Sequence, residues 1–326
     1  MSGIMGTGLA AGINGTLAEL LESDERVVLL GEDIGRLGGV FRVTRGLQER
    51  FGPERVRDAI LAESAIVGQA IGMALAGLVP MCEIQFDGFS FPAANQLVTQ
   101  AARIGQRWNG RDDLHLVVRI PSGGGTRAVE HHADSNEGVF AAVPGLRVAY
   151  PSTVEDHRDV LAEALALPGP VLVYEPIPLY WKRSRALPDA VAPRNRTSAR
   201  VLRPGRDATL VTYGAMTRTA LDAADALAES VDVEVLDLRW LSPLDEDGIL
   251  ASVRRTGRLV VAQESSPTHG VGAEVAALAA ERAFDALRAP VRRLGAPHRP
   301  PPPADVEASI RIQRDDIVQT IQEVMA

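Results

Sequence analysis

The chain has 326 residues, of which 46% are hydrophobic and 23% charged, an ordinary balance for a globular protein. Its length exceeds what one hydrophobic core usually supports, so two domains are predicted. The formal net charge is -8 and no run of lysine and arginine forms a basic stripe, which argues against nucleic acid as a partner.

Three features of the sequence bear on its surroundings. The single cysteine, Cys82, cannot form a disulfide within the chain, and residues 1–10 lack the basic start and apolar core of a signal peptide. Glu63, Gln69 and Glu83 interrupt the most apolar stretch before it reaches the roughly 18 residues of a membrane-spanning helix. We therefore expect a cytoplasmic protein that does not act on membranes.

Short runs of β-branched and aliphatic residues alternate with alanine-rich helical patterns along the chain. This alternation predicts an α/β protein with parallel sheets covered by helices. In chain order the predicted strands cover residues 26–32, 114–120, 146–150, 170–176, 208–214, 231–238 and 257–264.

Between the two halves, residues 182–200 are charged, contain proline and lack apolar periodicity, which predicts an exposed linker. The proline-rich segment 296–307 predicts a stiff surface connection. Behind it, Ile317, Ile321 and Val324 keep helical spacing, so the chain is expected to end in a helix.

The stretch LAESAIVGQAIGMALAG, residues 61–77, carries one ionisable side chain, Glu63, among apolar residues. Two rows of residues follow it on the predicted helix: an apolar stripe of Val67, Ile71, Leu75 and Leu78, and a ridge of small side chains at Ser64, Gly68, Gly72 and Ala76. Small side chains let another backbone come close, and so apolar a helix is expected to be buried on most sides. Glu63 then either caps the helix or is a sequestered carboxyl group that manages one proton on a ligand.

The next segment, CEIQFDGFSFPAANQ, holds three of the seven phenylalanines of the chain, at Phe86, Phe89 and Phe91. Core packing explains two of these rings. The remaining ring is predicted to form a flat wall against a heteroaromatic ligand.

Two glycine-rich segments are candidates for anion or nucleotide binding. SGGGTR, residues 122–127, lacks the Gly-Lys-Ser/Thr ending of a phosphate loop, which favours a flexible turn. GVGAEV, residues 270–275, has Val275 where the third glycine of a dinucleotide fingerprint belongs. This favours packing of a helix against a sheet.

The polar loop HHADSNEG, residues 131–138, is a solvated loop or the site of a general acid or base. Adjacent histidines in an extended segment point to opposite sides, so a metal site is not expected. The loop follows a predicted strand, where open α/β sheets bind ligands. His115, within a predicted strand, is interpreted as structural.

Five segments of the chain carry a family resemblance: LLGEDIGRLGGVFRVTRGLQERFG, AESAIVGQAIGMALAG, HADSNEGVFAAVPGLRVAYPST, LDLRWLSPLDEDGI and HGVGAEVAALAAE. In this order, from about residue 13 to the C-terminus, the chain resembles the β subunit of the thiamine-diphosphate-dependent decarboxylating component of 2-oxoacid dehydrogenase complexes. That family belongs to the transketolase superfamily. The resemblance implies two three-layer α/β domains with mainly parallel sheets: a pyrimidine-binding domain over residues 1–190 and a transketolase C-terminal-like domain over residues 191–326.

The resemblance also implies functions for four side chains. Glu63 would hydrogen-bond the ring nitrogen of the cofactor's aminopyrimidine, which favours its imino tautomer. Phe89 falls where the family places a ring over the pyrimidine, and Gln85, on the same strand face, is expected to line the site. His132, and not His131, aligns with the histidine that the family uses for protons when a lipoyl group is acylated.

Part of the cofactor site is absent from the sequence. Thiamine enzymes usually hold the diphosphate and its Mg2+ with a Gly-Asp-Gly element and a later Asn, and no Gly-Asp-Gly occurs here. The resemblance implies that an α subunit supplies it in an α2β2 heterotetramer, which serves a lipoyl acyltransferase core. Branched-chain 2-oxoacids are the leading substrate prediction, and pyruvate follows closely.

The chain departs from the family pattern at two places. Ala59 and Ile60 stand where a Thr-Pro pair is common, and residues 296–303 replace a proline element that bears on docking to the acyltransferase. Three other functions remain open: a carboligase that uses an aldehyde acceptor, a nucleotide-binding oxidoreductase that uses residues 270–275, and a non-catalytic scaffold for the α subunit.

Overall fold

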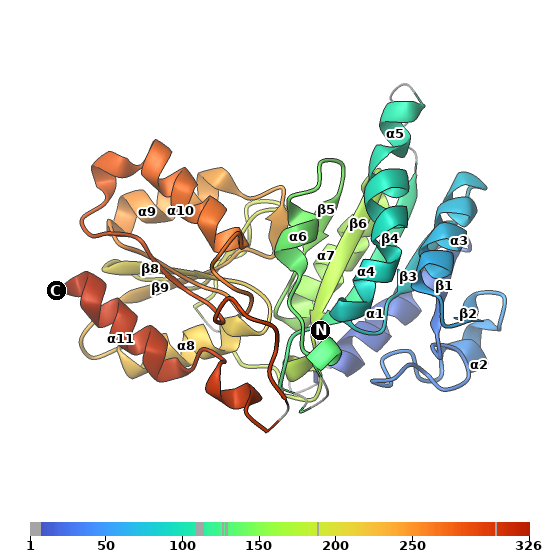
Figure 1. The fold of residues 1–326 in the computed structure, drawn as a ribbon, viewed down its shortest axis with the longest axis horizontal. Helices are drawn as coiled ribbons and strands as arrows, with labels where there is room; N and C mark the ends of the chain where they lie inside the picture. Colours follow the sequence, from blue (N-terminus) through green and yellow to red (C-terminus); the bar gives the residue numbers. More distant parts are fainter. Residues whose placement is uncertain (1–7, 109–113, 126, 128–129, 188, 304) are drawn as a thin grey trace.

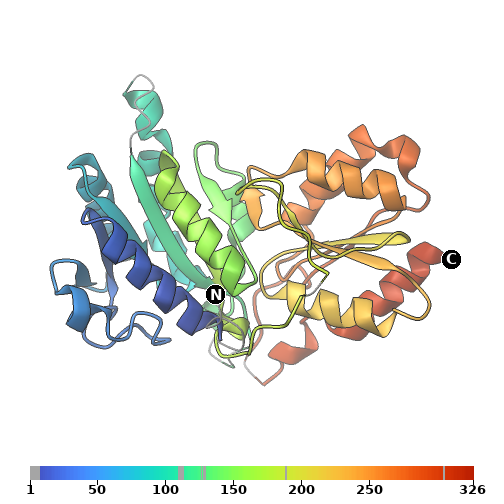
Figure 2. The same cartoon turned by 180° about the vertical axis from the view of Figure 1, so that it is seen from behind.

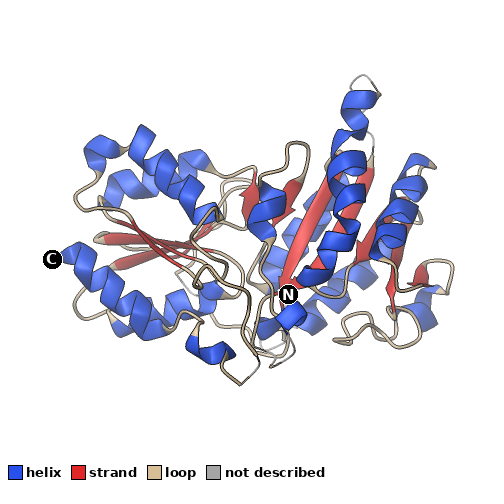
Figure 3. Cartoon of the chain, viewed as in Figure 1, coloured by secondary structure: helices blue, strands red, loops and turns tan. Residues whose placement is uncertain are grey.

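The computed structural model describes residues 8–108, 114–125, 127, 130–187, 189–303 and 305–326. They form two α/β domains, each with a mainly parallel sheet between two layers of helices, as expected (Figures 1 and 3). Within these ranges no helix combines the length and the apolar character needed to cross a membrane.

The first sheet has seven strands in the order β10-β5-β6-β4-β3-β1-β2. The strands are β1 (Val27–Glu32), β2 (Val56–Ala59), β3 (Val79–Glu83), β4 (His115–Ser122), β5 (Arg147–Ala149), β6 (Gly169–Pro176) and β10 (Trp240–Ser242). All neighbours pair in parallel except β10, which runs antiparallel to β5.

Helices cover both faces of this sheet, which is why its strands read as continuous apolar runs. Side chains alternate along β1: Val28 and Leu30 pack with α3 (Glu63–Leu75), whereas Val27 and Leu29 pack with α1 (Leu9–Ser23) and α7 (Val154–Ala166). Figure 2 shows α1 in blue beside α7 in yellow-green. The remaining short elements are α2 (Leu47–Phe51), η1 (Asp87–Phe89), α4 (Ser90–Ala94), the π-helical η2 (Asn95–Gln100), η3 (Ala101–Arg103), α5 (Ile104–Arg107), η4 (Glu130–His132), α6 (Glu137–Ala141) and η5 (Ile177–Leu179).

The second sheet has five strands in the order β12-β11-β8-β9-β7. They are β7 (Arg200–Arg203), β8 (Ala208–Thr212), β9 (Val233–Asp237), β11 (Leu259–Ala262) and β12 (Arg292–Leu294). One face packs against α8 (Met216–Ala226) and α11 (Arg314–Met325), and the other against α9 (Glu246–Thr256) and α10 (Val271–Arg282). The predicted final helix is confirmed as α11, and its three apolar residues are buried. Two short helices, η6 (Phe284–Ala286) and η7 (Glu307–Ser309), complete the domain.

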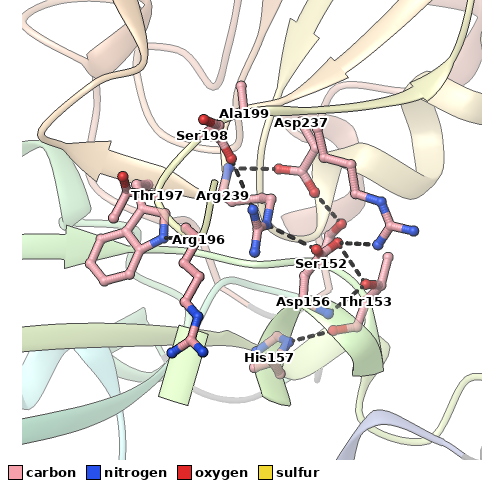
Figure 4. A network of polar contacts seen from close by, with 12 residues as sticks. Ser152, Thr153, Asp156, His157, Arg196, Thr197, Ser198, Ala199, Asp237 and Arg239 are labelled. Carbon is pink, nitrogen blue, oxygen red and sulfur yellow. Dashed lines mark hydrogen bonds and ion pairs between the residues drawn. The ribbon is translucent and has the colours of Figure 1, made fainter. Parts of the chain in front are cut away.

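The two domains are joined through β10, which lies in the second half of the sequence but extends the first sheet. The amide of Tyr150 donates to the carbonyl of Arg239 at 2.7 Å, directly before β10. Beside this junction a polar network connects the halves (Figure 4): Asp156 of α7 accepts hydrogen bonds from Arg200 at 3.0 Å and Thr153 at 2.7 Å, and it pairs with Arg239. One hydrophobic cluster also runs through both domains. The predicted boundary between residues 190 and 191 remains a prediction.

The expectation that helix α3 is buried on most sides is wrong for this chain. Its residues Ile66, Val67 and Ala70 are buried under the first sheet, but Leu75 of the predicted apolar stripe is 43% exposed. The ridge of small residues also faces outward, and a Cβ added at Gly72 would meet nothing within 4 Å. The chain therefore covers only one face of α3.

Candidate functional site

The predicted site residues lie along the carboxyl edge of the first sheet, where open parallel sheets bind ligands. Glu63 opens α3 just after β2, and Gln85 and Phe89 follow β3. His132 lies in η4, after the end of β4. The four predicted residues thus lie on the connections that follow β2, β3 and β4 of the first sheet, in which β1 separates β2 from β3.

Glu63 does not cap its helix. The N-cap position is Ala62, no side chain caps α3, and no hydrogen bond or ion pair joins the Glu63 carboxylate to another residue of the described ranges. The side chain is partly exposed. The capping interpretation is therefore wrong. Within the described residues Glu63 is not sequestered from solvent either, and its role in managing a proton on a ligand stays a prediction.

A second carboxylate, Glu32, lies near Glu63 and was missed by the sequence reasoning. Burial raises the pKa of Glu32, and the negative charges of Asp33 and Glu63 raise it further. The Gln85 amide nitrogen lies 3.4 Å from the carbonyl oxygen of Glu32, which places Gln85 beside the same pair. Glu32 ends β1, so the rule that ligands bind at strand ends would have found it.

Aromatic rings surround His132. The centroid of its ring lies 4.3 Å from that of Phe86 and 5.2 Å from that of Phe89, both in edge-on geometry. Phe86 is buried in the core, Phe89 is partly exposed, and Phe91 is 51% exposed. The His132 Nδ1 atom is buried and has no hydrogen-bond partner among the residues that the structure describes. The predicted pair Phe89 and His132 is therefore in contact, with a ring nitrogen unused.

The loop that carries His132 is attached to both domains. At its end, Glu137 is fully buried and accepts hydrogen bonds from Tyr213 at 2.7 Å and Ser265 at 2.6 Å, both in the second domain. Burial raises the pKa of Glu137. From the first domain, the Asp87 carboxylate accepts a hydrogen bond from the backbone of Asn136. No pattern in the sequence predicts either of these long-range contacts.

The glycine-rich loop at residues 122–125 uses its amides within the chain. Gly124 donates to Glu264 at 3.1 Å, Gly125 donates to Glu307, and Arg311 bridges to Glu264 at 3.1 Å. Two carboxylates of the second domain thus occupy the positions that an anionic ligand would need. This contradicts the flexible-turn interpretation, because the loop is held in place.

The segment 270–275 opens α10, as its position in the sequence suggests. The Gly272 amide donates to the Gln263 side chain at 2.7 Å, and a Cβ at Gly272 would lie 3.0 Å from Val261 of β11. Close contact between helix and sheet explains this glycine, and its amide is not free for a phosphate. His115 likewise has a structural contact, 2.9 Å from the carbonyl of Leu165.

A cavity of about 380 Å³ lies between the His132 loop and the proline-rich segment of the second domain. Asp134, Asn136, Glu264, Pro297 and Arg311 are among its walls. Burial raises the pKa of Asp134 and of Glu264. In the described part of the chain, no group of three or more His, Cys, Asp or Glu side chains is arranged to hold a metal ion.

Comparisons with known proteins agree with this architecture. The family model of the transketolase pyrimidine-binding domain matches residues 7–181, and that of the transketolase C-terminal domain matches residues 197–317. A solved structure titled "Split gene transketolase, inactive beta4 tetramer" superimposes with a TM-score of 0.77 over 98% of both chains at 24% identity, which shows the fold.

Curated relatives are similar over almost the whole chain. The pyruvate dehydrogenase E1 component subunit beta of Leifsonia xyli is 44% identical over 96% of this chain and 93% of its own. The 3-methyl-2-oxobutanoate dehydrogenase subunit beta of Mycobacterium tuberculosis is 45% identical over 96% and 90%. The Bacillus subtilis pyruvate dehydrogenase subunit is 41% identical over 96% and 97%. The chain therefore belongs to the β subunits of pyruvate and branched-chain 2-oxoacid dehydrogenases, enzymes of the thiamine diphosphate family.

Proposed function

We propose that this chain is the β half of a dehydrogenase for branched-chain 2-oxoacids, which decarboxylates its substrate with thiamine diphosphate and transfers the acyl group to lipoyl. The observation that carries the proposal is the Glu63 carboxylate. It is partly exposed, has no partner in the described ranges, and lies at the sheet edge that also carries Phe89 and His132. Pyruvate is the alternative substrate, since relatives of both names match equally well.

The residues present fit the pyrimidine half of thiamine diphosphate. When bound, the cofactor supplies the electron sink for loss of CO2. Glu63 would hold a proton at a pyrimidine ring nitrogen. Phe89 would pack on the ring, and Gln85 would line the pocket. His132 would exchange a proton with the lipoyl sulfur through one of its two ring nitrogens, Nδ1 or Nε2.

The other half of the site needs a partner. The sequence has no Gly-Asp-Gly element for the diphosphate and Mg2+, so we propose an α subunit that carries it, in an α2β2 assembly with a lipoyl acyltransferase core. The outward ridge of α3 supports this proposal, because small residues at a free surface permit close helix packing. Ile60 and Leu61, next to Glu63, are also 77% and 72% exposed.

Reconstitution with an α chain that carries Gly-Asp-Gly tests the function. We expect oxidation of 3-methyl-2-oxobutanoate, with transfer of the acyl group to a lipoyl domain, at a higher kcat/KM than pyruvate. Glu63→Gln should lower turnover by several orders of magnitude, because an amide cannot manage the pyrimidine proton. Glu49→Gln, on the exposed surface of α2, is the control and should keep full activity.

Other outcomes would reassign the chain. Turnover only with an aldehyde acceptor would make it a carboligase. Full activity of the Glu63→Gln assembly would make it a scaffold. Tight NAD binding without any thiamine diphosphate requirement would favour a nucleotide-binding oxidoreductase.

A further inference from the structure

Asp87 connects two parts of the site that are distant in sequence. It is 2% exposed and begins η1, two residues before Phe89. Its Oδ2 atom accepts hydrogen bonds from the backbone N–H of Asn136 at 2.6 Å and from the Ser122 hydroxyl at 3.0 Å. Asn136 belongs to the loop of His132. The carboxylate therefore ties the turn of Phe89 to the loop of the histidine.

The two segments also approach each other closely beside this hydrogen bond. A Cβ at Gly88 would overlap the carbonyl oxygen of His131 and the carboxylate of Asp134. The rings of Phe86 and His132 are in contact at 4.3 Å. A fixed distance between η1 and the loop is thus part of the architecture.

The His132 ring itself has no hydrogen bond to any residue of the described ranges. Ring contacts and the backbone of its own loop are what set its place. Near the ring, hydrogen bonds from the first domain hold the loop backbone at two places in the described residues. The Asn136 amide donates to Asp87, and the Asp134 carbonyl accepts from the Gly123 amide at 3.1 Å and the Ser122 hydroxyl at 3.4 Å. Of these hydrogen bonds, the one to Asp87 is the shortest and involves a carboxylate, so it is the strongest.

We propose that Asp87 is a positioning residue, which holds the His132 loop in the place where the histidine serves acyl transfer to the lipoyl group. The inference rests on the proposed function for the identity of the reaction, and on the hydrogen bonds for the anchor. Asp87 acts through the backbone of Asn136 and does not contact the substrate.

The charge of the Asp87 carboxylate varies within the physiological pH range. Burial, with smaller contributions from the charges of Glu137 and Asp134, raises the pKa of Asp87 to about 7, although the hydrogen bonds from Asn136 and Ser122 oppose the rise. Tyr150 and Tyr174 are the other titratable groups that face it, and burial raises their pKa values well above the ordinary one. An ionised carboxylate accepts more strongly than a protonated one, so the anchor strengthens as the pH rises through 7.

The test uses the assembled enzyme with its α subunit and two assays, 2-oxoacid oxidation with ferricyanide and acylation of a lipoyl domain. In Asp87→Ala we expect acylation to fall by about tenfold or more, since about 1.4 kcal/mol of lost positioning is tenfold in rate, while ferricyanide oxidation stays within roughly threefold. Asp87→Asn keeps a hydrogen-bond acceptor, so its acylation rate should equal the rate that the wild type shows below pH 7. Unlike the wild-type rate, it should not increase as the pH rises through 7.

Asp237→Ala is the matched control. Asp237 is also fully buried, burial raises its pKa to about 7, and it accepts from a serine hydroxyl and a backbone amide, but it lies away from the His132 loop. Asp237→Ala should not lower acylation of the lipoyl domain more than it lowers ferricyanide oxidation. Equal acylation by Asp87→Ala and wild type, or the same selective loss in Asp237→Ala, overturns the inference.

Hydrogen exchange separates this inference from the proposed function. In Asp87→Ala the amides of residues 131–139 should exchange faster than in the wild type, and in Asp237→Ala they should not. If the wild-type assembly oxidises no 2-oxoacid, the proposed function fails, whereas unchanged exchange in Asp87→Ala refutes the anchor by itself.

Discussion

At the scale of single residues, the candidate site combines side chains that are unpaired in the described part of the chain. There, neither the Glu63 carboxylate nor the Nδ1 atom of His132 has a hydrogen-bond partner, although Nδ1 is buried. Unsatisfied polar groups are costly in a folded protein unless a ligand or partner uses them. The sequence predicts a role for both residues through their family pattern. It could not identify Asp87, because its relevance comes from a contact over 49 residues of chain, whereas the place of Glu32 at the end of a predicted strand was a usable signal.

Two phenylalanines in the same segment offer a matched pair for cofactor binding. Phe89→Ala removes the ring beside His132 and should weaken thiamine diphosphate binding to the assembled enzyme by roughly tenfold, or about 1.4 kcal/mol. Phe91→Ala removes an exposed ring and should leave the Kd unchanged. Calorimetric titration of both variants checks this, and equal affinities would remove Phe89 from the site.

At the scale of elements, burial decides which strands can be predicted. The seven predicted strands are confirmed, and five more, β2, β3, β7, β10 and β12, lie outside the predicted runs. Four of the five are the edges of the two sheets. An edge strand has fewer neighbours and tolerates charge, as VRDA in β2 and RRL in β12 show. The fifth, β3, is a central strand, but it contains Pro80, and a proline within an apolar run argues against a central strand.

Two glycines of α1 should respond in opposite directions to alanine. A Cβ at Gly12 would lie 2.5 Å from the Val154 side chain of α7, so Gly12→Ala forces the two helices apart and should lower the free energy of unfolding by about 1–3 kcal/mol. Gly15 is exposed, with nothing within 4 Å, so Gly15→Ala should raise it by about 0.5–1 kcal/mol. Urea denaturation measures both, and destabilisation by both would contradict the packing argument.

The ridge on α3 gives a prediction about assembly. Gly72→Leu places a large side chain where the chain itself leaves open space, so the isolated subunit should keep its stability. If an α subunit packs on the ridge, this variant should lose assembly in size-exclusion chromatography. Ala11→Leu is the control. Ala11 is an exposed residue of α1, on the opposite face of the sheet, so this variant should assemble normally. Normal assembly of Gly72→Leu would place the partner elsewhere.

At the scale of the whole molecule, buried acids make stability depend on pH. Burial raises the pKa of Asp87 and of Asp237 from the ordinary 3.8 to about 7. The folded chain therefore binds these protons more tightly than the unfolded chain, and each contribution is complete below about pH 4 and lost as the pH rises through 7. We expect the free energy of unfolding to fall between pH 5 and pH 7.5 in denaturation experiments. Asp237→Asn should flatten this fall, and an unchanged slope would contradict it.

The strand β10 has a consequence for how the protein can be divided. It completes the edge of the first sheet from the second half of the sequence, next to the buried pairs of Asp156. A polypeptide cut at the linker would leave the backbone groups of β5 open, and an open edge recruits strands from other molecules. Expression of the first half alone should yield aggregates, whereas coexpression of both fragments should restore a dispersed complex, because the missing strand then arrives in trans.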